Sequence, residues 1–78
     1  MGITFTNVAR KALRNMPARD RAALIAKLEA FAATGAGDVK KLIGREEYRL
    51  RHGNWRAIFV IENDMIVLKV AHRRQVYR

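Results

Sequence analysis

The sequence predicts an α+β fold in which an N-terminal edge strand and a helical hairpin pack on an antiparallel C-terminal sheet. Two segments with the 3.6-residue period of amphipathic helices occupy the N-terminal half of the chain. Three β-branched and aromatic segments, separated by short turns, occupy the C-terminal half. The expected element order is β-α-α-β-β-β, and we expect residues 1–78 to form a single domain because this length suits one core.

The first strand and the first helix are expected close together near the N-terminus. Residues 3–5 form a short run that suits an edge strand. Thr6 or Asn7 can cap a helix that continues to about Asn15, because their side-chain oxygens accept hydrogen bonds from free backbone N–H groups. The apolar stripe of this helix consists of Val8, Ala12, Leu13 and Met16.

The second helix is expected from Pro17 or Ala18 to about Ala33, after a break at the proline. Gly35 ends it, since glycine readily adopts the left-handed conformation of a helix C-cap. Its apolar side consists of Leu24, Ile25, Leu28, Phe31 and Ala32. Together the two helices predict an antiparallel hairpin of the right size to cover one face of the sheet. Residues 38–42 are predicted to form a short helical turn.

The C-terminal half contains three predicted strands. They cover residues 48–51, 55–61 and 65–71. The pairs Gly53-Asn54 and Asn63-Asp64 separate them, and both pairs tolerate the positive φ of tight hairpin turns. The three strands should therefore form an antiparallel meander.

The strand register follows if both turns contain two residues. Arg51 then lies opposite Arg56, and Arg49 lies opposite Ile58. Across the second turn, the expected pairs are Ile61 with Ile66, Ile58 with Lys69, and Arg56 with Ala71. Because side chains alternate along a strand, the two faces separate. The face expected beneath the helices carries Tyr48, Leu50, Ala57, Phe59, Ile61, Ile66, Leu68 and Val70. The uncovered face carries Arg49, Arg51, Arg56, Lys69 and Arg73, with Ile58, Val60 and Val67 between them.

The clustered arginines indicate an anion site. Several cations on one surface, with the phenol of Tyr77 nearby and no carboxylate among them, suit binding a phosphate and stabilising charge on it. Like charges directly opposite each other disfavour a sheet, so Arg51 facing Arg56 is a local cost that often marks a functional site. The alternative interpretation is that Arg49 and Arg51 are the solvated side of an amphipathic strand.

Composition favours a polyanionic partner. The formal net charge of +9 and the isoelectric point near 11.2 suit nucleic acid first and an acidic protein second. The chain contains no cysteine, and no carboxylate is predicted beside His52 or His72, so we expect no metal ion and no cofactor. The apolar runs are too short to span a bilayer, so we expect a cytoplasmic protein that does not bind a membrane.

Four motifs occur together in the second half of the chain. They are Lys41-Leu42-Ile43-Gly44, Tyr48-Arg49-Leu50-Arg51, Gly53-Asn54-Trp55-Arg56-Ala57-Ile58-Phe59 and Val70-Ala71-His72-Arg73-Arg74-Gln75-Val76-Tyr77. This combination resembles the RelE/ParE superfamily of toxins from type II toxin–antitoxin systems. The first half agrees with that superfamily in the order of its elements. The resemblance implies the β-α-α-β-β-β fold and a toxin function.

The resemblance implies one of two activities. RelE-like members are ribosome-dependent mRNA endoribonucleases that use the ribose 2′-hydroxyl as nucleophile and need no metal ion. ParE-like members share the fold but inhibit DNA gyrase, and a cognate antitoxin neutralises members of either type. We expect the RelE-like activity, with mRNA and the ribosome as partners, and keep gyrase inhibition as the alternative. A degenerate relative that only binds its antitoxin or nucleic acid is a third possibility.

The resemblance also implies the residues of the site. The matching positions are Arg49, Arg51, Arg56, Arg73 and Tyr77. Arg56 and Arg73 are expected to stabilise the charge that develops on phosphorus, because guanidinium groups form planar forks with phosphate oxygens. The two arginines of the first meander strand are expected to position the phosphate.

Proton transfer and further RNA contacts complete the expected site. Tyr77 is one candidate for the base that removes the proton of the 2′-hydroxyl, because the surrounding cations favour its ionised form. His72 is the other, because imidazole titrates near neutral pH. In the expected register, however, His72 points to the helix-covered face. Additional RNA-binding residues are expected to be Lys40, Lys41, Lys69 and Arg74.

Overall fold

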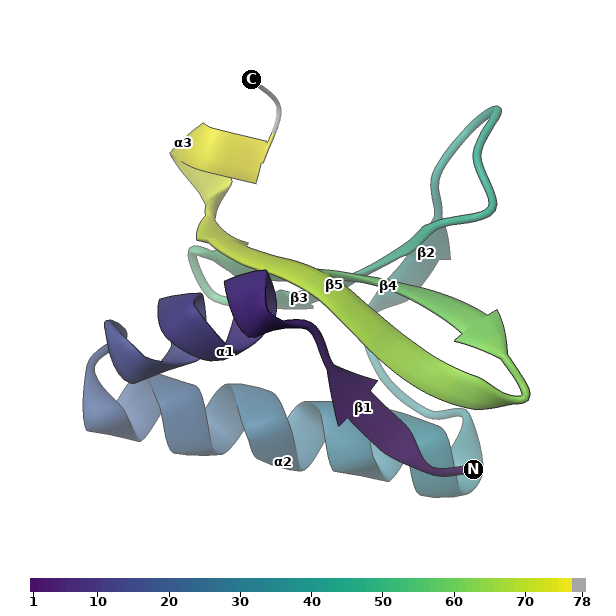
Figure 1. The fold of residues 1–78 in the computed structure, drawn as a ribbon, viewed down its shortest axis with the longest axis horizontal. Coiled ribbons are helices and arrows are strands. Elements are labelled where there is room, and N and C mark those ends of the chain that lie inside the picture. The colour runs from purple at the N-terminus through teal and green to yellow at the C-terminus, as the bar shows by residue number, and fades with distance from the viewer. Residues whose placement is uncertain (77–78) are drawn as a thin grey trace.

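A five-stranded mixed sheet, in the order β1-β5-β4-β3-β2, carries two helices on one of its faces (Figure 1). The computed structural model describes residues 1–76. The elements are β1 (Ile3–Phe5), α1 (Asn7–Arg14), α2 (Ala18–Thr34), β2 (Val39–Lys41), β3 (Tyr48–His52), β4 (Trp55–Glu62), β5 (Asp64–His72) and α3 (Arg73–Val76). The predicted α+β class is confirmed, with β1 as an edge strand that pairs in parallel with β5.

The helices begin and end where their capping residues predict. Thr6 is the N-cap of α1, and its Oγ1 accepts a hydrogen bond from the backbone N of Ala9 at 3.1 Å. Gly35 ends α2 at a φ of 76°, which favours glycine. One position in the predicted stripe of α1 is wrong, because Val8 is exposed and Ala9 is buried instead. Ala9 and Leu13 are the residues of α1 that pack into the core cluster, so the buried side of the helix passes through position 9 and not through position 8.

The predicted helical turn over residues 38–42 is wrong, since this segment contains strand β2. Lys40 pairs with Arg49 of β3, and the carbonyl of Asp38 accepts a hydrogen bond from the backbone N of Arg51. The physical reason is that β3 would otherwise leave its outer row of peptide groups without protein partners. A three-residue edge strand with two lysines closes the sheet on that side.

The first hairpin has the predicted register, whereas the second differs near its turn. Arg51 lies opposite Arg56, as expected for the two-residue turn. In the second hairpin only Asn63, with a φ of 65°, separates the paired residues Glu62 and Asp64. Ile61 therefore lies opposite Met65 rather than Ile66. A bulge beside the Ile58/Phe59 step restores the predicted pairs of Ile58 with Lys69 and Arg56 with Ala71.

The bulge decides which side chains of β5 enter the core. Phe59 pairs with Val67 and Ile58 with Lys69, so Leu68 is the extra residue. Met65 and Val67 are fully buried, whereas Ile66 and Leu68 are half-buried. The prediction that Ile66 and Leu68 face the helices and Val67 faces away is therefore wrong. Ile61 is exposed as well, at the end of the sheet near the second turn.

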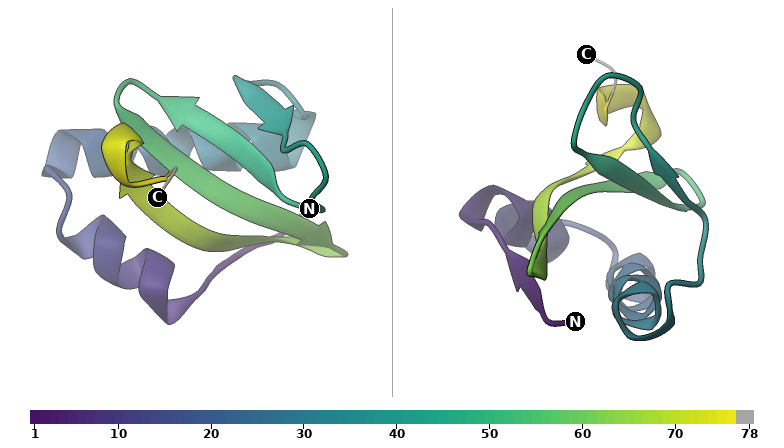
Figure 2. Two further views of the ribbon diagram at one scale, coloured as in Figure 1. Left: turned by 90° about the horizontal axis from the view of Figure 1, so that it is seen from above. Right: turned by 90° about the vertical axis from the view of Figure 1, so that its right-hand side faces the viewer.

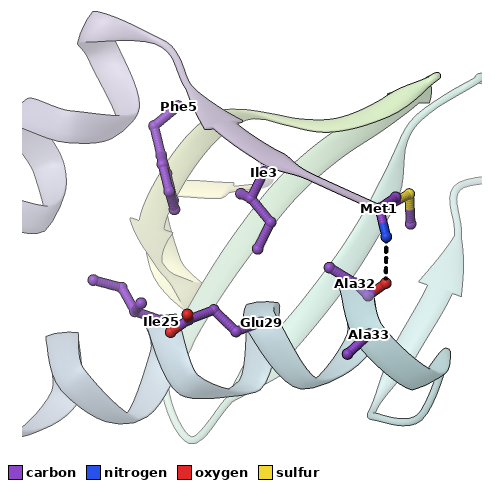
Figure 3. Close-up of a pocket in the computed structure, with 7 residues that line it drawn as sticks. All are labelled: Met1, Ile3, Phe5, Ile25, Glu29, Ala32 and Ala33. Atoms are coloured by element: carbon purple, nitrogen blue, oxygen red, sulfur yellow. Dashed lines mark hydrogen bonds between the residues drawn. The ribbon is translucent and has the colours of Figure 1, made fainter.

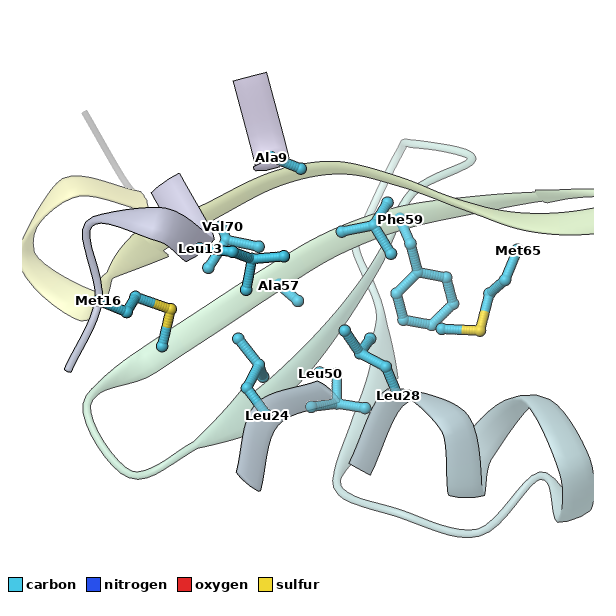
Figure 4. Packing of buried hydrophobic residues seen from close by; sticks show 11 residues of the cluster. Ala9, Leu13, Met16, Leu24, Leu28, Leu50, Ala57, Phe59, Met65 and Val70 are labelled. Carbon is cyan, nitrogen blue, oxygen red and sulfur yellow. The ribbon is translucent and has the colours of Figure 1, made fainter. Parts of the chain in front are cut away.

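The core lies between the sheet and the two helices (Figure 4). Phe59 is at its centre and is in contact with the rings of Phe31 and Tyr48, at centroid distances of 5.4 and 5.5 Å. The buried cluster consists of Ala9, Leu13, Met16, Leu24, Leu28, Leu50, Ala57, Phe59, Met65, Val67 and Val70. No helix within residues 1–76 combines the length and apolar character needed to cross a membrane.

Thr6 links α1 to the bulge in β5. Its backbone N donates a hydrogen bond to the carbonyl of Val67 at 3.0 Å, and its Oγ1 donates to the carbonyl of Leu68 at 2.8 Å. The same hydroxyl oxygen accepts from Ala9 N. The Thr6 side chain therefore caps α1 and also gives a hydrogen-bond donor to the carbonyl of Leu68, the extra residue of the bulge.

Replacing Thr6 tests this linkage. Thr6→Val keeps the shape of the side chain but removes the hydroxyl, so we expect unfolding to become easier by about 1–2 kcal/mol. Thr6→Ser keeps the hydroxyl and is the matched control, which should retain most of the stability. Urea denaturation measures both, and equal losses in the two variants would contradict the linkage.

A comparison of Met65 with Ile66 tests the register of the second hairpin. Met65→Ala should lower the free energy of unfolding by about 2–5 kcal/mol, because Met65 is fully buried. Ile66→Ala should cost clearly less, since Ile66 is half-buried on the other face. A larger loss for Ile66→Ala in thermal or urea denaturation would support the unbulged register instead.

Candidate nucleic-acid interface

The sheet face opposite α1 and α2 is the candidate interface. In Figures 1 and 2, α3 and the connection between β2 and β3 rise from this face, whereas the two long helices lie beneath the sheet. The register aligns Lys40 with Arg49, Arg49 with Ile58, and Ile58 with Lys69. These residues form one row across β2, β3, β4 and β5. We call Lys40, Arg49 and Lys69 the cation row.

The cation row is accessible to different degrees. Lys40 is exposed, and Arg49 and Lys69 are half-buried. Ile58, between the arginine and the lysine, is 7% exposed and supplies an apolar floor. The long stem of Lys69 can rest on this floor and direct its charge outward, whereas Nε of Arg49 is buried and the rest of its guanidinium is only partly accessible. Such a row has the chemistry to follow a phosphate backbone.

Arg51 lies on the same face but forms an ion pair. Its Nε donates a hydrogen bond to Oδ2 of Asp38 at 2.9 Å, and both side chains are about half exposed. The expectation that no carboxylate lies among the arginines is therefore wrong. The cause is strand β2, which places Asp38 directly beside β3.

Arg56 is buried, with 8% of its surface exposed. Its Nη1 donates hydrogen bonds to the carbonyls of Gly53 at 2.8 Å and Trp55 at 3.0 Å. Its Nε is buried and has no hydrogen-bond partner among the described residues. The guanidinium therefore holds the turn between β3 and β4, and it does not present an open fork to solvent as the strand pattern predicts.

The end of β5 places two more arginines above the candidate interface. Arg73 and Arg74 begin α3, and both are exposed. The backbone N of Arg73 donates a hydrogen bond to the carbonyl of Asn54, so α3 is attached to the turn between β3 and β4. Tyr77, expected as the phenol of the site, lies outside the described residues.

The two histidines lie at the end of the sheet, on the side of the helices. His72 is half-buried and pairs with Trp55, whose ring it meets edge-on at a centroid distance of 5.5 Å. His52 ends β3, and its Nε2 lies 3.6 Å from Oδ1 of Asp20 in α2. The expectation that no carboxylate lies beside His52 is therefore wrong, because α2 brings Asp20 to the end of β3 although the two residues are far apart along the chain. Within residues 1–76, no group of three or more histidine or carboxylate side chains is arranged to hold a metal ion.

The last residue of β2 and the connection that follows it carry further cations that carboxylates partly neutralise. Lys41 Nζ lies 3.9 Å from Glu46, and Arg45 lies 3.5 Å from Glu47. Ile43 at the tip of this connection is fully exposed. Lys41, expected to contact RNA, is thus close to a negative charge, but the pair is exposed and weak.

A groove of about 520 Å³ lies between β1 and α2, away from the cation row (Figure 3). Its lining is mostly apolar and consists of Met1, Ile3, Phe5, Ile25, Glu29, Ala32 and Ala33. The terminal amino group of Met1 donates a hydrogen bond to the carbonyl of Ala32 at 3.0 Å. The groove contains one carboxylate and no histidine, so it has no constellation for acid–base chemistry.

Comparison with protein families and solved structures gives a consistent likeness. A family model described as ParE toxin of type II toxin-antitoxin system, parDE, matches residues 3–77. Comparison with curated proteins gives no significant match. Several solved toxin–antitoxin complexes contain chains with a similar fold.

The toxin–antitoxin complex RelB-RelE from Methanococcus jannaschii contains a chain that superposes with a TM-score of 0.79 at 25% identity. The match covers 94% of this chain and 93% of that chain. The archaeal RelE-RelB complex from Pyrococcus horikoshii OT3 gives a TM-score of 0.78 at 22% identity, with 96% and 97% of the two chains covered.

A third likeness is to the intact E. coli RelBE toxin-antitoxin complex, with a TM-score of 0.74 at 22% identity. The match covers 91% of this chain and 94% of that chain. At identities below 25%, the second and third likenesses show a common fold.

The burial of Arg56 leads to a stability prediction. Arg56→Ala should lower the free energy of unfolding by about 1–3 kcal/mol, because it removes charge-assisted hydrogen bonds to two turn carbonyls. Arg73→Ala, at an exposed position, should change it by less than about 0.5 kcal/mol. Thermal denaturation compares the two variants. Equal stability would contradict the structural role of Arg56.

Proposed function

Because the chain belongs to the ParE toxin family of type II toxin–antitoxin systems, we propose that it is a toxin that cuts mRNA on the ribosome without a metal ion. The observation that carries this proposal is the cation row of Lys40, Arg49 and Lys69 on the sheet face that the long helices leave uncovered. Helix α3, which begins with the exposed Arg73 and Arg74, stands on the same side of the sheet (Figure 1).

Cleavage in this proposal is an internal transfer of the phosphoryl group. The ribose 2′-oxygen forms a bond to phosphorus, the bond to the 5′-oxygen of the next nucleotide breaks, and the 5′-oxygen takes up a proton. The products are a 2′,3′-cyclic phosphate and a 5′-hydroxyl. Negative charge increases on the phosphorus oxygens in the transition state, so preorganised cations lower the barrier.

The residues differ in the role that the geometry allows. Arg49 positions the scissile phosphate, and Arg73 stabilises the developing charge, because it is exposed at the start of α3, on the same side of the sheet as the row. Arg51 can exchange Asp38 for a phosphate at little cost, since an exposed ion pair contributes about 0.2–1 kcal/mol. Arg56 acts as a positioning residue that fixes the turn to which α3 is attached.

The base that removes the 2′-hydroxyl proton is assigned to Tyr77 in this proposal. His72 is less suitable, because it contacts Trp55 on the helix side of the sheet. Proton removal by a positioned group contributes about 10²–10⁴ in rate. Replacing the phenol by phenylalanine should therefore slow cleavage while leaving RNA binding intact.

Gyrase inhibition without cleavage is the second candidate. Two observations favour it. The matching family model is that of the ParE toxin. In addition, Arg56 is bound to backbone carbonyls of a turn and Arg51 is paired with Asp38, so two of the predicted cations are already engaged. A weaker anion site suits binding better than catalysis. The two candidates share the fold and differ in the target.

The proposed partners follow from the charge and the likenesses. The relatives described above were solved as complexes with antitoxins. With a net charge of +9, this chain suits a cognate antitoxin that offers acidic side chains. In this proposal the toxin acts in the cytoplasm, on ribosomes if it is a nuclease and on gyrase if it is the second candidate.

Mapping of mRNA ends after induction without the antitoxin tests the activity. We expect cuts in phase with codons that carry 2′,3′-cyclic phosphates. Arg49→Ala and Arg73→Ala should each reduce the cleavage rate on isolated ribosomes by roughly 10²–10³, because each removes one charged donor. Lys27→Gln, which removes an exposed cation on α2, is the control and should cleave normally.

Two results would contradict the proposed nuclease. Intact mRNA together with accumulating gyrase–DNA breaks would replace the nuclease by the gyrase inhibitor. Cleavage that persists in both arginine variants would show that the cation row is not the site.

A further inference from the structure

Helix α1 carries a second group of cations, remote from the cation row. Arg10, Lys11 and Arg14 are exposed, whereas Ala9 and Leu13 of the same helix are buried. The three cations therefore share the outward side of α1, and we call them the α1 stripe. The helix contains no carboxylate.

No carboxylate neutralises the α1 stripe within the part of the chain that the structure describes. Its three side chains form no ion pair and no hydrogen bond with residues 1–76. The nearest carboxylate along the chain, Asp20, faces His52 instead. The cations of the sheet edge differ, because Lys41, Arg45 and Arg51 each lie near Glu46, Glu47 or Asp38.

The arrangement is unfavourable for the isolated helix. Arg10 and Arg14 are four residues apart, and Lys11 and Arg14 are three apart, so like charges are neighbours on the surface. Lys11 and Arg14 lie in the last turn, where the helix dipole tolerates them, but Arg10 has no such compensation. Positive charge kept together at a local cost indicates an anionic partner.

The shape and composition of the stripe favour a double helix. No aromatic residue occurs between Phe5 and Phe31, so this surface offers no platform on which single-stranded bases can stack. The exposed Val8 is about 60° from Lys11 around the helix axis, so it lies at the border of the stripe and not between its cations. An interface with an acidic protein would need apolar or aromatic anchors among the cations. Guanidinium forks without such anchors suit backbone phosphates.

The α1 stripe and the candidate interface lie in different parts of the molecule. In Figure 2, α1 lies beyond the β5 side of the sheet, whereas the connection between β2 and β3 lies at the other side. Helix α3 stands on the opposite face from α1 (Figure 1). Both surfaces can therefore be occupied together.

We propose that the α1 stripe binds the phosphate backbone of a double-helical nucleic acid. This inference does not depend on the cleavage proposed above. It gives the toxin a second contact with structured RNA or with duplex DNA, made through charge and helix shape without reading bases.

Binding of labelled oligonucleotides, followed by fluorescence anisotropy at several salt concentrations, tests the proposal. The probes are an RNA duplex of roughly 16 base pairs, a DNA duplex of the same sequence, and one single RNA strand. The variant R10Q/R14Q should bind at least one duplex about tenfold more weakly. Its slope of log affinity against log salt should fall by about 2, since each phosphate contact contributes about 0.9.

The control is K27Q/R45Q, which removes the same charge from exposed positions elsewhere. It should keep the salt slope of the wild type to within about 1. R10K/R14K should retain most of the affinity. An unchanged or raised melting temperature of R10Q/R14Q shows that the variant is folded, because like-charge contacts have been removed.

The outcomes separate the possibilities. Preference for one duplex identifies the source of the phosphates as RNA or DNA. Equal losses in R10Q/R14Q and K27Q/R45Q would overturn the proposal, because net charge alone would then explain binding. Loss of affinity for poly-glutamate, with duplex binding unchanged, would assign the stripe to an acidic protein instead. Cleavage of mRNA is not a readout, so failure here does not bear on the nuclease.

Discussion

The hydrogen bonds of Thr6 to the bulged part of β5 are the constraint on which the fold and the candidate interface depend. The bulge allows both Met65 and Val67 on one side of it, and Val70 on the other, to enter the core. At the same time it leaves Lys69 in line with Arg49 on the uncovered face. A regular strand with Lys69 on the uncovered face would turn Ile66 and Leu68 toward the helices, so the bulge is what brings Met65 and Val67 into the core without moving Lys69.

Charge on the uncovered face is organised by the edge of the sheet as well as by the arginines themselves. Strand β2 adds Lys40 to the row and also adds Asp38, which pairs with Arg51. The like-charge contact between Arg51 and Arg56 is thereby relieved, since one guanidinium meets a carboxylate and the other meets backbone carbonyls. The resulting surface is less cationic than the strand pattern alone predicts, although it still offers a line of positive charge.

A domain of 78 residues has little interior beyond its core, so its chemistry must occur on surfaces. Family membership establishes a toxin of a type II toxin–antitoxin system. The proposed cleavage of mRNA rests on the cation row of the sheet, whereas the proposed duplex contact rests on the α1 stripe. The first has an apolar floor and a neighbouring helix that suit a single strand, whereas the second is a bare outward stripe that suits a double helix.

The α+β class, both long helices, the first hairpin and the placement of Arg49 and Arg51 on one face could all be predicted from the amino-acid sequence. These features depend on local signals, namely capping residues, the proline break, the Gly53-Asn54 turn and strict alternation. Three features became visible only in the folded chain: residues 39–41 form an edge strand, Leu68 is the extra residue of a bulge, and Arg56 is buried. Each of these depends on contacts between distant residues, such as Thr6 with β5 and Asp38 with β3. Local propensity carries no information about such contacts, because their free energy arises only when the sheet and helices assemble.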